Sequence, residues 1–74
     1  MYATRPPPFG LLLKRHRRAA GMTQEDLADK ARIHRTYLSD VERGTRNVSL
    51  INIERLAEAL SLSMAELLSR ATSR

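Results

Sequence analysis

The amino-acid sequence predicts an all-α fold, a compact bundle of five short helices. Apolar residues recur at the helical period of about 3.6 residues in five segments, and no segment shows the alternation of a β-strand. Glycines and helix-capping serines separate these segments. A chain of 74 residues forms one small domain. Such a domain buries only about 60% of its unfolded surface, so oligomerisation would stabilise it.

The composition excludes several classes of protein. The chain has no cysteine, so it has neither a disulfide framework nor a thiolate metal site, as expected in the reducing cytosol. No apolar run approaches the roughly 18–20 residues of a membrane span. The apolar triplet near the N-terminus precedes its cluster of basic residues, the reverse of a secretory signal. We therefore expect a cytoplasmic protein that does not enter a membrane.

The net charge of +5 is concentrated in the front of the chain. Between Lys14 and Arg46 there are nine basic and five acidic residues, whereas Asn47 to Arg74 contains three of each. A basic surface is typical of proteins that bind a polyanion such as nucleic acid. Charged residues also serve simply to solvate a surface, so the distribution alone leaves both interpretations open.

The chain begins with a proline-rich segment. Residues 1–8 include three consecutive prolines, which favour an extended polyproline conformation, so we expect a flexible arm. A proline-rich ligand for a partner protein is the alternative, although the fuller PxxP context is missing. The folded domain should then occupy residues 9–70, followed by a short tail, residues 71–74.

The first helix is predicted from Phe9 or Gly10 to Ala20, with Gly21 as its stop. Its inner-facing residues would be Phe9, Leu12, Leu13 and Ala20. Four basic residues crowd its outer and C-terminal part: Lys14, Arg15, Arg17 and Arg18. Cations at a helix C-terminus also stabilise the helix dipole, so structure alone could account for some of them.

The second helix begins at a capping box. Thr23 is an N-cap residue, and Asp26, three residues later, completes a shortened form of the box. Acidic residues in this first turn also suit the positive end of the helix dipole. The apolar side consists of Leu27, Ala28 and Ala31. This pattern predicts one short amphipathic helix.

A third helix follows after a turn of about three or four residues. Ile33, Leu38 and Val41 share its buried side. Its other side is rich in groups that bind base edges and phosphates: Arg35, Thr36, Tyr37, Ser39, Asp40 and Arg43. Two short helices joined in this way have the dimensions of a helix-turn-helix, whose second helix enters the major groove of DNA. The small Ala28 suits the close approach of the two helices.

Two further helices complete the domain. Gly44 would cap the third helix and Asn47 would form a turn, after which Ser49 caps a helix from Leu50 to about Leu60. The predicted core residues of this helix are Leu50, Ile53, Leu56, Ala57 and Leu60, with Ile51 off their stripe. A full capping box, Ser63 to Glu66, opens the last helix, Met64 to about Arg70, which carries Leu67 and Leu68.

Three stretches of the sequence resemble a known family. GMTQEDLA, HRTYLSDVERG and RNVSL resemble the helix-turn-helix of the Cro/cI repressor superfamily, and together they are most similar to the controller proteins of bacterial restriction–modification systems. The resemblance covers Leu12 to Leu68. One departure is Arg32, at a turn position where the family often has glycine. A left-handed residue other than glycine costs about 1 kcal/mol there.

This resemblance implies a DNA-binding regulator and assigns roles to the third helix and its neighbours. Arg35 has the planar fork that matches guanine O6 and N7, and Thr36 offers a hydroxyl and a methyl group to a base edge. Asp40 could accept from cytosine N4, although pairing with Arg43 or Arg35 is the preferred alternative. Glu42 is expected in an internal ion pair. The residues expected at the DNA backbone or minor groove are Arg17, Thr23, Gln24, Tyr37, Ser39, Arg43, Arg46 and Asn47.

One such module contacts too few base pairs to single out a site in a genome. We therefore expect a homodimer on a two-fold symmetric operator of double-stranded DNA, with half-sites about 34 Å apart. The dimer interface is expected in the charge-neutral back half, at Ile51, Leu62, Met64 and Leu68. Alternatively, these residues complete the core. The chain contains no ligand domain, so no small-molecule ligand is expected.

The sequence does not support an enzymatic function. His16 and His34 lie on different elements, and without cysteine or an HExxH-type spacing they do not form a metal site. The sequence lacks a glycine-rich phosphate loop and any Ser/His/Asp arrangement, so we expect no catalytic residue and no cofactor. Besides a restriction–modification controller, two alternatives stay open: another small phage-type or stand-alone repressor, and an antitoxin or other protein-interaction module.

Overall fold

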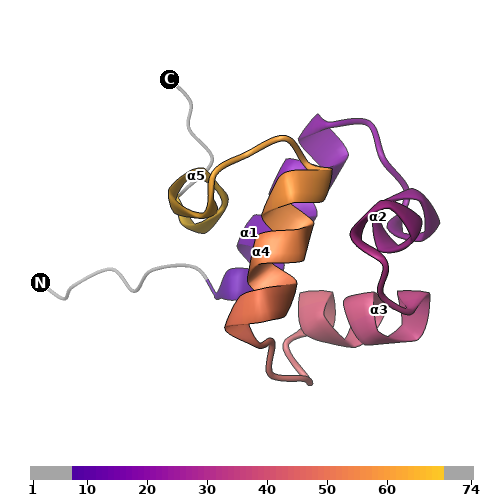
Figure 1. Ribbon diagram of the computed structural model, residues 1–74. Coiled ribbons are helices and arrows are strands. Elements are labelled where there is room, and N and C mark those ends of the chain that lie inside the picture. The colour runs from indigo at the N-terminus through magenta and orange to yellow at the C-terminus, as the bar shows by residue number, and fades with distance from the viewer. Residues whose placement is uncertain (1–7, 70–74) are drawn as a thin grey trace, which may run out of the picture.

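A computed structural model describes residues 8–69 of the chain. Within this range it contains five α-helices and no β-strand, which confirms the predicted fold class. The helices are α1 (Phe9–Ala19), α2 (Gln24–Ala31), α3 (Arg35–Arg43), α4 (Leu50–Ala59) and α5 (Met64–Leu68). Helix α1 packs against α3 and α5, and α4 packs against α2 and α5. In Figure 1, α2 and α3 lie on one side of α4, and α5 lies on the other.

The core takes one fully buried leucine from each helix: Leu13, Leu27, Leu38, Leu56 and Leu67. All five leucines belong to one hydrophobic cluster, so each helix contributes to the same core. Burying one such side chain stabilises the fold by about 1.5–3 kcal/mol. The predicted arm and tail lie outside the described residues. The exception is Pro8, which is the N-cap residue of α1.

The capping predictions for the described helices are confirmed. The Thr23 hydroxyl accepts from the Asp26 backbone N–H at 3.0 Å, and the Asp26 carboxylate accepts from the Thr23 N–H at 3.1 Å. Ser63 and Glu66 form the same reciprocal pair at the start of α5. Ser49 caps α4 by accepting from the Asn52 N–H at 3.2 Å. Each cap satisfies backbone donors that a helix start leaves without a partner.

Two residues other than glycine have left-handed backbone conformations within the described range. Arg32 has φ 62°, as the family's frequent glycine at this position implied, and it is the C-cap residue of α2. Ser61 has φ 59° and was not predicted; it follows α4, where the Leu62 N–H donates to the Ala57 carbonyl at 2.8 Å. A side chain in this region costs about 1–2 kcal/mol relative to glycine. Both positions therefore hold a local strain that glycine would relieve.

Some core predictions are wrong. Leu50 is 72% exposed, because it is the first residue of α4 and projects beyond the end of the packed core. Ala20 is exposed, since α1 ends at Ala19 and Ala20 is its C-cap. The face that α1 buries includes Gly10 and Arg17 instead. Gly10 is buried because the backbone of α3 passes directly over it: a Cβ there would lie 2.3 Å from the Val41 carbonyl oxygen.

Candidate nucleic-acid interface

Helices α2 and α3 and the short turn between them form the predicted helix-turn-helix. The turn comprises residues 32–34, and it is closed by a hydrogen bond from the Ile33 N–H to the Ala28 carbonyl at 3.0 Å. Ala28, whose small size suits a close approach of the helices, is buried. Because residue 32 is left-handed, the chain changes direction within three residues and α3 packs across α2.

The first turn of α3 presents polar groups to solvent. His34 is the N-cap residue, and its side chain makes no capping hydrogen bond. Arg35 and Thr36 are exposed, and neither side chain has a hydrogen-bond or ion-pair partner among residues 8–69. Their donors and acceptors are therefore available to a molecule outside the chain. The buried residues of α3, Leu38 and Val41, fix which face is left outside.

A buried ion pair joins α1 to α3. Arg17 Nε donates to Glu42 Oε2 at 2.7 Å, and Arg17 Nη2 donates to Glu42 Oε1 at 3.0 Å. The third nitrogen of the guanidinium, Nη1, donates to the Met22 carbonyl at 2.8 Å. The two side chains are only 9% and 3% exposed. The internal ion pair expected of Glu42 is thus confirmed, and its partner is Arg17.

This arrangement corrects the prediction that Arg17 contacts a phosphate. All three guanidinium nitrogens are engaged inside the protein, and the residue is 8% exposed. Its partner Glu42 also accepts, at Oε1, a hydrogen bond of 3.0 Å from the Gln24 side-chain amide. Gln24 is the first residue of α2. Arg17 is therefore connected through Glu42 to the start of α2, and it does not lie at the surface.

Asp40 pairs with two arginines. Its carboxylate binds the Arg43 guanidinium, and its second oxygen lies 3.9 Å from Arg46 Nη1. The pairing with Arg43 was the preferred alternative, and it is confirmed. Arg43 Nη1 also donates to the Ser39 hydroxyl at 3.1 Å. The Asp40 carboxylate therefore lies between two cations, hydrogen-bonded to Arg43 and within ion-pair distance of Arg46.

Tyr37 anchors the loop after α3. Its ring lies under the Arg46 guanidinium, 5.1 Å from the guanidinium carbon to the ring centroid, a cation–π geometry. Its hydroxyl lies 3.5 Å from the Asn47 carbonyl and accepts from the Asn52 side-chain amide at 3.1 Å. Asn52 belongs to α4 and was not among the predicted residues. Tyr37, predicted at the DNA backbone, is half-buried and connects α3 with the loop and with α4.

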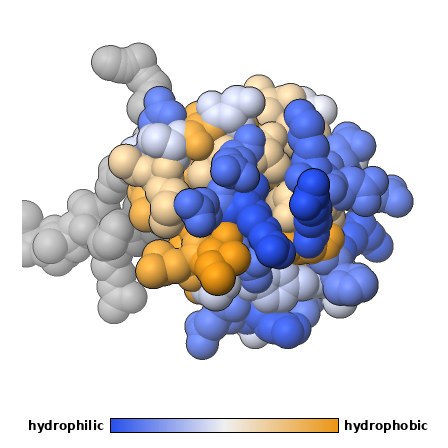
Figure 2. Space-filling view, viewed as in Figure 1, coloured by the Kyte–Doolittle hydropathy of each residue, from blue (hydrophilic) through white to orange (hydrophobic). Residues whose placement is uncertain are grey.

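The predicted dimer residues divide into two groups. Ile51 is 63% exposed and Leu68 is 47% exposed, whereas Leu62 and Met64 are half-buried against the core. The exposed Leu50 lies beside Ile51, and Figure 2 shows an apolar patch near the N-terminal end of α4 on an otherwise largely hydrophilic face. Two of the four predicted interface residues are therefore exposed, and Leu50 adds a third exposed apolar side chain.

The described part of the chain contains neither a candidate metal site nor a candidate membrane span. Among residues 8–69 no group of three or more His, Cys, Asp or Glu side chains is placed to hold a metal ion. No helix of this range is both long and apolar enough to cross a membrane. His16 lies apart from His34, and its Nε2 is 3.5 Å from the Ser69 carbonyl oxygen.

Comparison with known proteins identifies the family. The helix-turn-helix family model matches residues 13–67. Control protein C.BamHI of Bacillus amyloliquefaciens is 55% identical over 49 residues, which span 66% of this chain and 60% of that protein. The crystal structure of the restriction-modification controller protein C.AhdI from Aeromonas hydrophila matches with a TM-score of 0.79 and 48% identity, over 81% of this chain and 91% of that chain.

A second similar structure is that of SinR, the master regulator for biofilm formation, in complex with DNA. Its TM-score is 0.77 at 32% identity, and the match covers 82% of this chain and 98% of that chain. The family model covers the whole of the helix-turn-helix described above, together with α4 and most of α5. The members of this family are regulators and not enzymes. The chain therefore belongs to the helix-turn-helix family of transcription regulators, together with the restriction–modification controller proteins.

Proposed function

We propose that this protein is a sequence-specific transcription regulator that binds a two-fold symmetric DNA operator as a homodimer, and that it controls a restriction–modification system. The observation that carries this proposal is the exposed first turn of α3, where Arg35 and Thr36 have no partner among the described residues. The similarity to control proteins and to a regulator solved with DNA supports it. The folded domain, residues 9–70, would act in the cytoplasm.

Base recognition would come from the start of α3. The planar guanidinium of Arg35 matches the two acceptors of guanine in the major groove. Thr36 can donate to a base edge or pack its methyl group against that of thymine. Asp40 would act mainly by holding Arg43 and Arg46.

Contacts to the DNA backbone would surround the recognition helix. The Gln24 amide stands at the N-terminus of α2, and Glu42 engages only one of its two N–H donors. Arg46 is held between the Tyr37 ring and Asp40, so its guanidinium loses little freedom when it meets a phosphate or the minor groove. The other backbone contacts would come from Thr23, Ser39, Arg43 and Asn47.

Dimerisation would bury the apolar patch at the start of α4. Leu50 and Ile51 are the most exposed of the large apolar side chains among the described residues, at 72% and 63%. Large apolar side chains that gather on a surface are typical of protein–protein interfaces. Leu68, on α5, would extend the contact, while Leu62 and Met64 would support it from the core side. Two copies related by a two-fold axis would then place two α3 helices in successive turns of the major groove.

The role of Arg35 can be tested by selection from randomised double-stranded DNA, followed by sequencing. The wild-type protein should select a motif with two-fold symmetry. Arg35→Ala should lose preference at one base pair per half-site, a loss of about 1–3 kcal/mol of discrimination there. Arg15→Ala is the control, since Arg15 is an exposed cation of α1 outside the helix-turn-helix. An Arg35→Ala motif identical to that of the wild type would refute this assignment.

The dimer proposal predicts that Ile51→Asp dissociates the protein. A two-fold interface buries this residue twice, so we expect the dimer dissociation constant to rise by about 100-fold. Sedimentation equilibrium over a concentration series measures the change. Leu11→Asp is the matched control, because Leu11 is an exposed apolar residue of α1 outside the predicted interface. Equal effects of the two substitutions would contradict the assignment of the interface to α4.

A further inference from the structure

A charged cleft lies between the C-terminal end of α2 and α4. Its volume is about 410 Å³, within the range of about 300–1,000 Å³ that small-molecule sites occupy. Two small residues, Ala31 and Ala59, are buried beneath it and leave room for it. The remaining lining residues are charged: Lys30, Arg32, Arg55 and Glu58.

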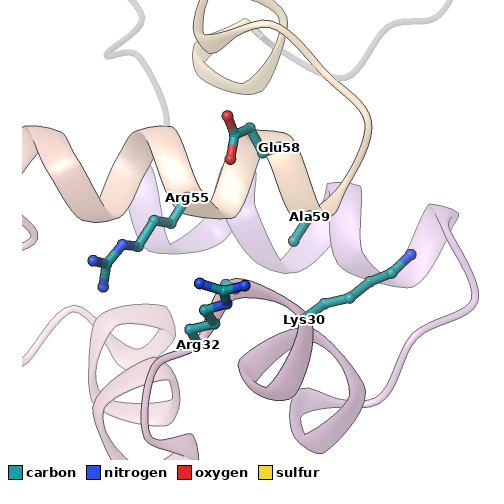
Figure 3. A pocket seen from close by; sticks show the side chains of 6 residues that line it. Lys30, Arg32, Arg55, Glu58 and Ala59 are labelled. Atoms are coloured by element: carbon teal, nitrogen blue, oxygen red, sulfur yellow. The ribbon is translucent and has the colours of Figure 1, made fainter.

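Two arginines line this cleft without a carboxylate partner among residues 8–69. Figure 3 shows the guanidinium groups of Arg32 and Arg55 directed into the gap between α4 and the α2–α3 turn. The Glu58 carboxylate points to the other side of α4, and the Lys30 ammonium points away from both arginines. Within residues 8–69, no carboxylate lies within ion-pair distance of Arg32 or Arg55. The two cations repel one another, and an anion between them would remove that repulsion.

The backbone of Arg32 provides a second, independent observation. Its left-handed conformation, at φ 62°, is one that glycine adopts without strain. No hydrogen bond of the Arg32 side chain offsets this strain, since the side chain is exposed and has no hydrogen-bond partner in the described part of the chain. Strained residues of this kind tend to occur where the side chain has a function outside the fold.

We propose that Arg32 and Arg55 form a clamp for a phosphate group, with Lys30 adding positive charge at the rim. A free phosphate or a phosphate monoester offers at least three acceptor oxygens and can engage both guanidinium forks. The two non-bridging oxygens of a DNA phosphodiester diverge from the phosphorus atom, so each can meet one arginine, whereas the two coplanar oxygens of a carboxylate suit a single fork. The phosphate could belong to the DNA backbone or to a free phosphate compound. The clamp itself does not require DNA binding, but the DNA source rests on the proposed function.

The first test is a titration of the isotope-labelled full-length chain with inorganic phosphate, followed by NMR at constant ionic strength maintained with sodium chloride. Saturable shifts are expected at the Arg32 and Arg55 side-chain N–H groups and at the Ala59 amide. Arg32→Gly should weaken binding by about tenfold or more, because one charge-assisted fork is lost. Glu58→Gln should tighten binding about twofold to threefold, because it removes the one negative charge of the lining.

Ser61→Gly provides the matched control for the backbone. Ser61 is the other left-handed residue that is not glycine in the described range, so this substitution relieves the same kind of strain without removing a cation. Both glycine variants should raise the melting temperature, and only Arg32→Gly should lose phosphate binding. A loss of binding in Arg32→Gly therefore cannot be attributed to unfolding.

The second test distinguishes the two sources. If the clamp binds the DNA backbone, Arg55→Gln should weaken binding to the selected operator and to unrelated DNA alike, and lower the salt slope by about one. If the clamp binds a free compound, the wild-type protein should bind inorganic phosphate, and Arg55→Gln should leave the salt slope of DNA binding unchanged. Arg35→Ala should keep the phosphate shifts even where base preference is lost, which separates this proposal from the proposed function.

Two outcomes would overturn the clamp. One is phosphate shifts that spread over all exposed cations and do not saturate, together with an unchanged salt slope in Arg55→Gln. The other is binding of an acidic peptide in the cleft without any response to phosphate, which would indicate a protein partner instead.

Discussion

Gly10→Ala is expected to destabilise the domain by about 3 kcal/mol or more, although alanine is normally the better helix residue. The added Cβ would lie 2.3 Å from the Val41 carbonyl oxygen and 2.7 Å from that of Glu42. Both atoms belong to the backbone of α3, so no side chain can rotate away and the two helices must separate. Thermal unfolding followed by circular dichroism should show a fall of about 15 °C or more, given about 4–8 °C per kcal/mol for domains of this size.

Gly44→Ala is the control for this substitution. Gly44 has φ 80°, and a Cβ placed there would meet nothing within 4 Å. Its cost should therefore be only the left-handed penalty of about 1–2 kcal/mol. If Gly10→Ala were neutral, or stabilised the protein as an ordinary helical glycine-to-alanine change does, the close contact between α1 and α3 would be absent in solution. Loss of that contact would also undermine the position of Glu42.

Features that depend on local sequence could be predicted, and they include much of the helix-turn-helix. Capping boxes act within three residues, so Thr23 and Ser63 marked the starts of α2 and α5 correctly. The left-handed turn at Arg32 was implied by the resemblance, since the family often has glycine at this position. The pairing of Asp40 with Arg43 is also local, since one turn of helix separates the two residues.

Features that depend on how distant segments meet could not be predicted. The sequence predicts that Arg17 contacts a phosphate, because it precedes the second helix and because the resembling family has this position near the DNA backbone. In fact Gly10, Leu13 and Arg17 share the buried face of α1, and Glu42, already expected in an ion pair, supplies the counter-charge from α3. The helical spacing of those three residues was the available signal. The contact between Asn52 and Tyr37 had no such signal, since the two residues are 15 positions apart and their contact depends on the tertiary packing of α3 and α4.

The exposed start of α4 is a second feature that the local sequence could not predict. Leu50 fits the apolar stripe of its helix, and periodicity alone assigns it to the core. A stripe continues past the point where the neighbouring helices end, however, and residues beyond that point remain exposed. Leu50 at 72% and Ile51 at 63% therefore mark where the core of one chain stops. That is also where a second copy would find apolar surface.

The buried ion pair leads to the second large effect. Arg17→Met should destabilise the domain by about 3–5 kcal/mol, because it leaves the Glu42 carboxylate buried with only the Gln24 amide as a partner. Glu42→Met should cost a similar amount by leaving the guanidinium unpaired. The double variant, Arg17→Met with Glu42→Met, should be more stable than either single variant, because no isolated charge remains buried. Chemical denaturation of all four proteins gives the coupling.

DNA binding by the double variant would separate the two roles of this pair. If the pair only stabilises the fold, the folded double variant should bind the operator as tightly as the wild type. If Glu42 also positions Gln24 for a phosphate, affinity should fall by about tenfold for all DNA sequences alike, because a backbone contact carries no sequence information. Arg17 buried at 8% exposure cannot make that contact itself. A uniform loss of affinity would therefore place Gln24 at the DNA backbone and make Arg17 a positioning residue for it.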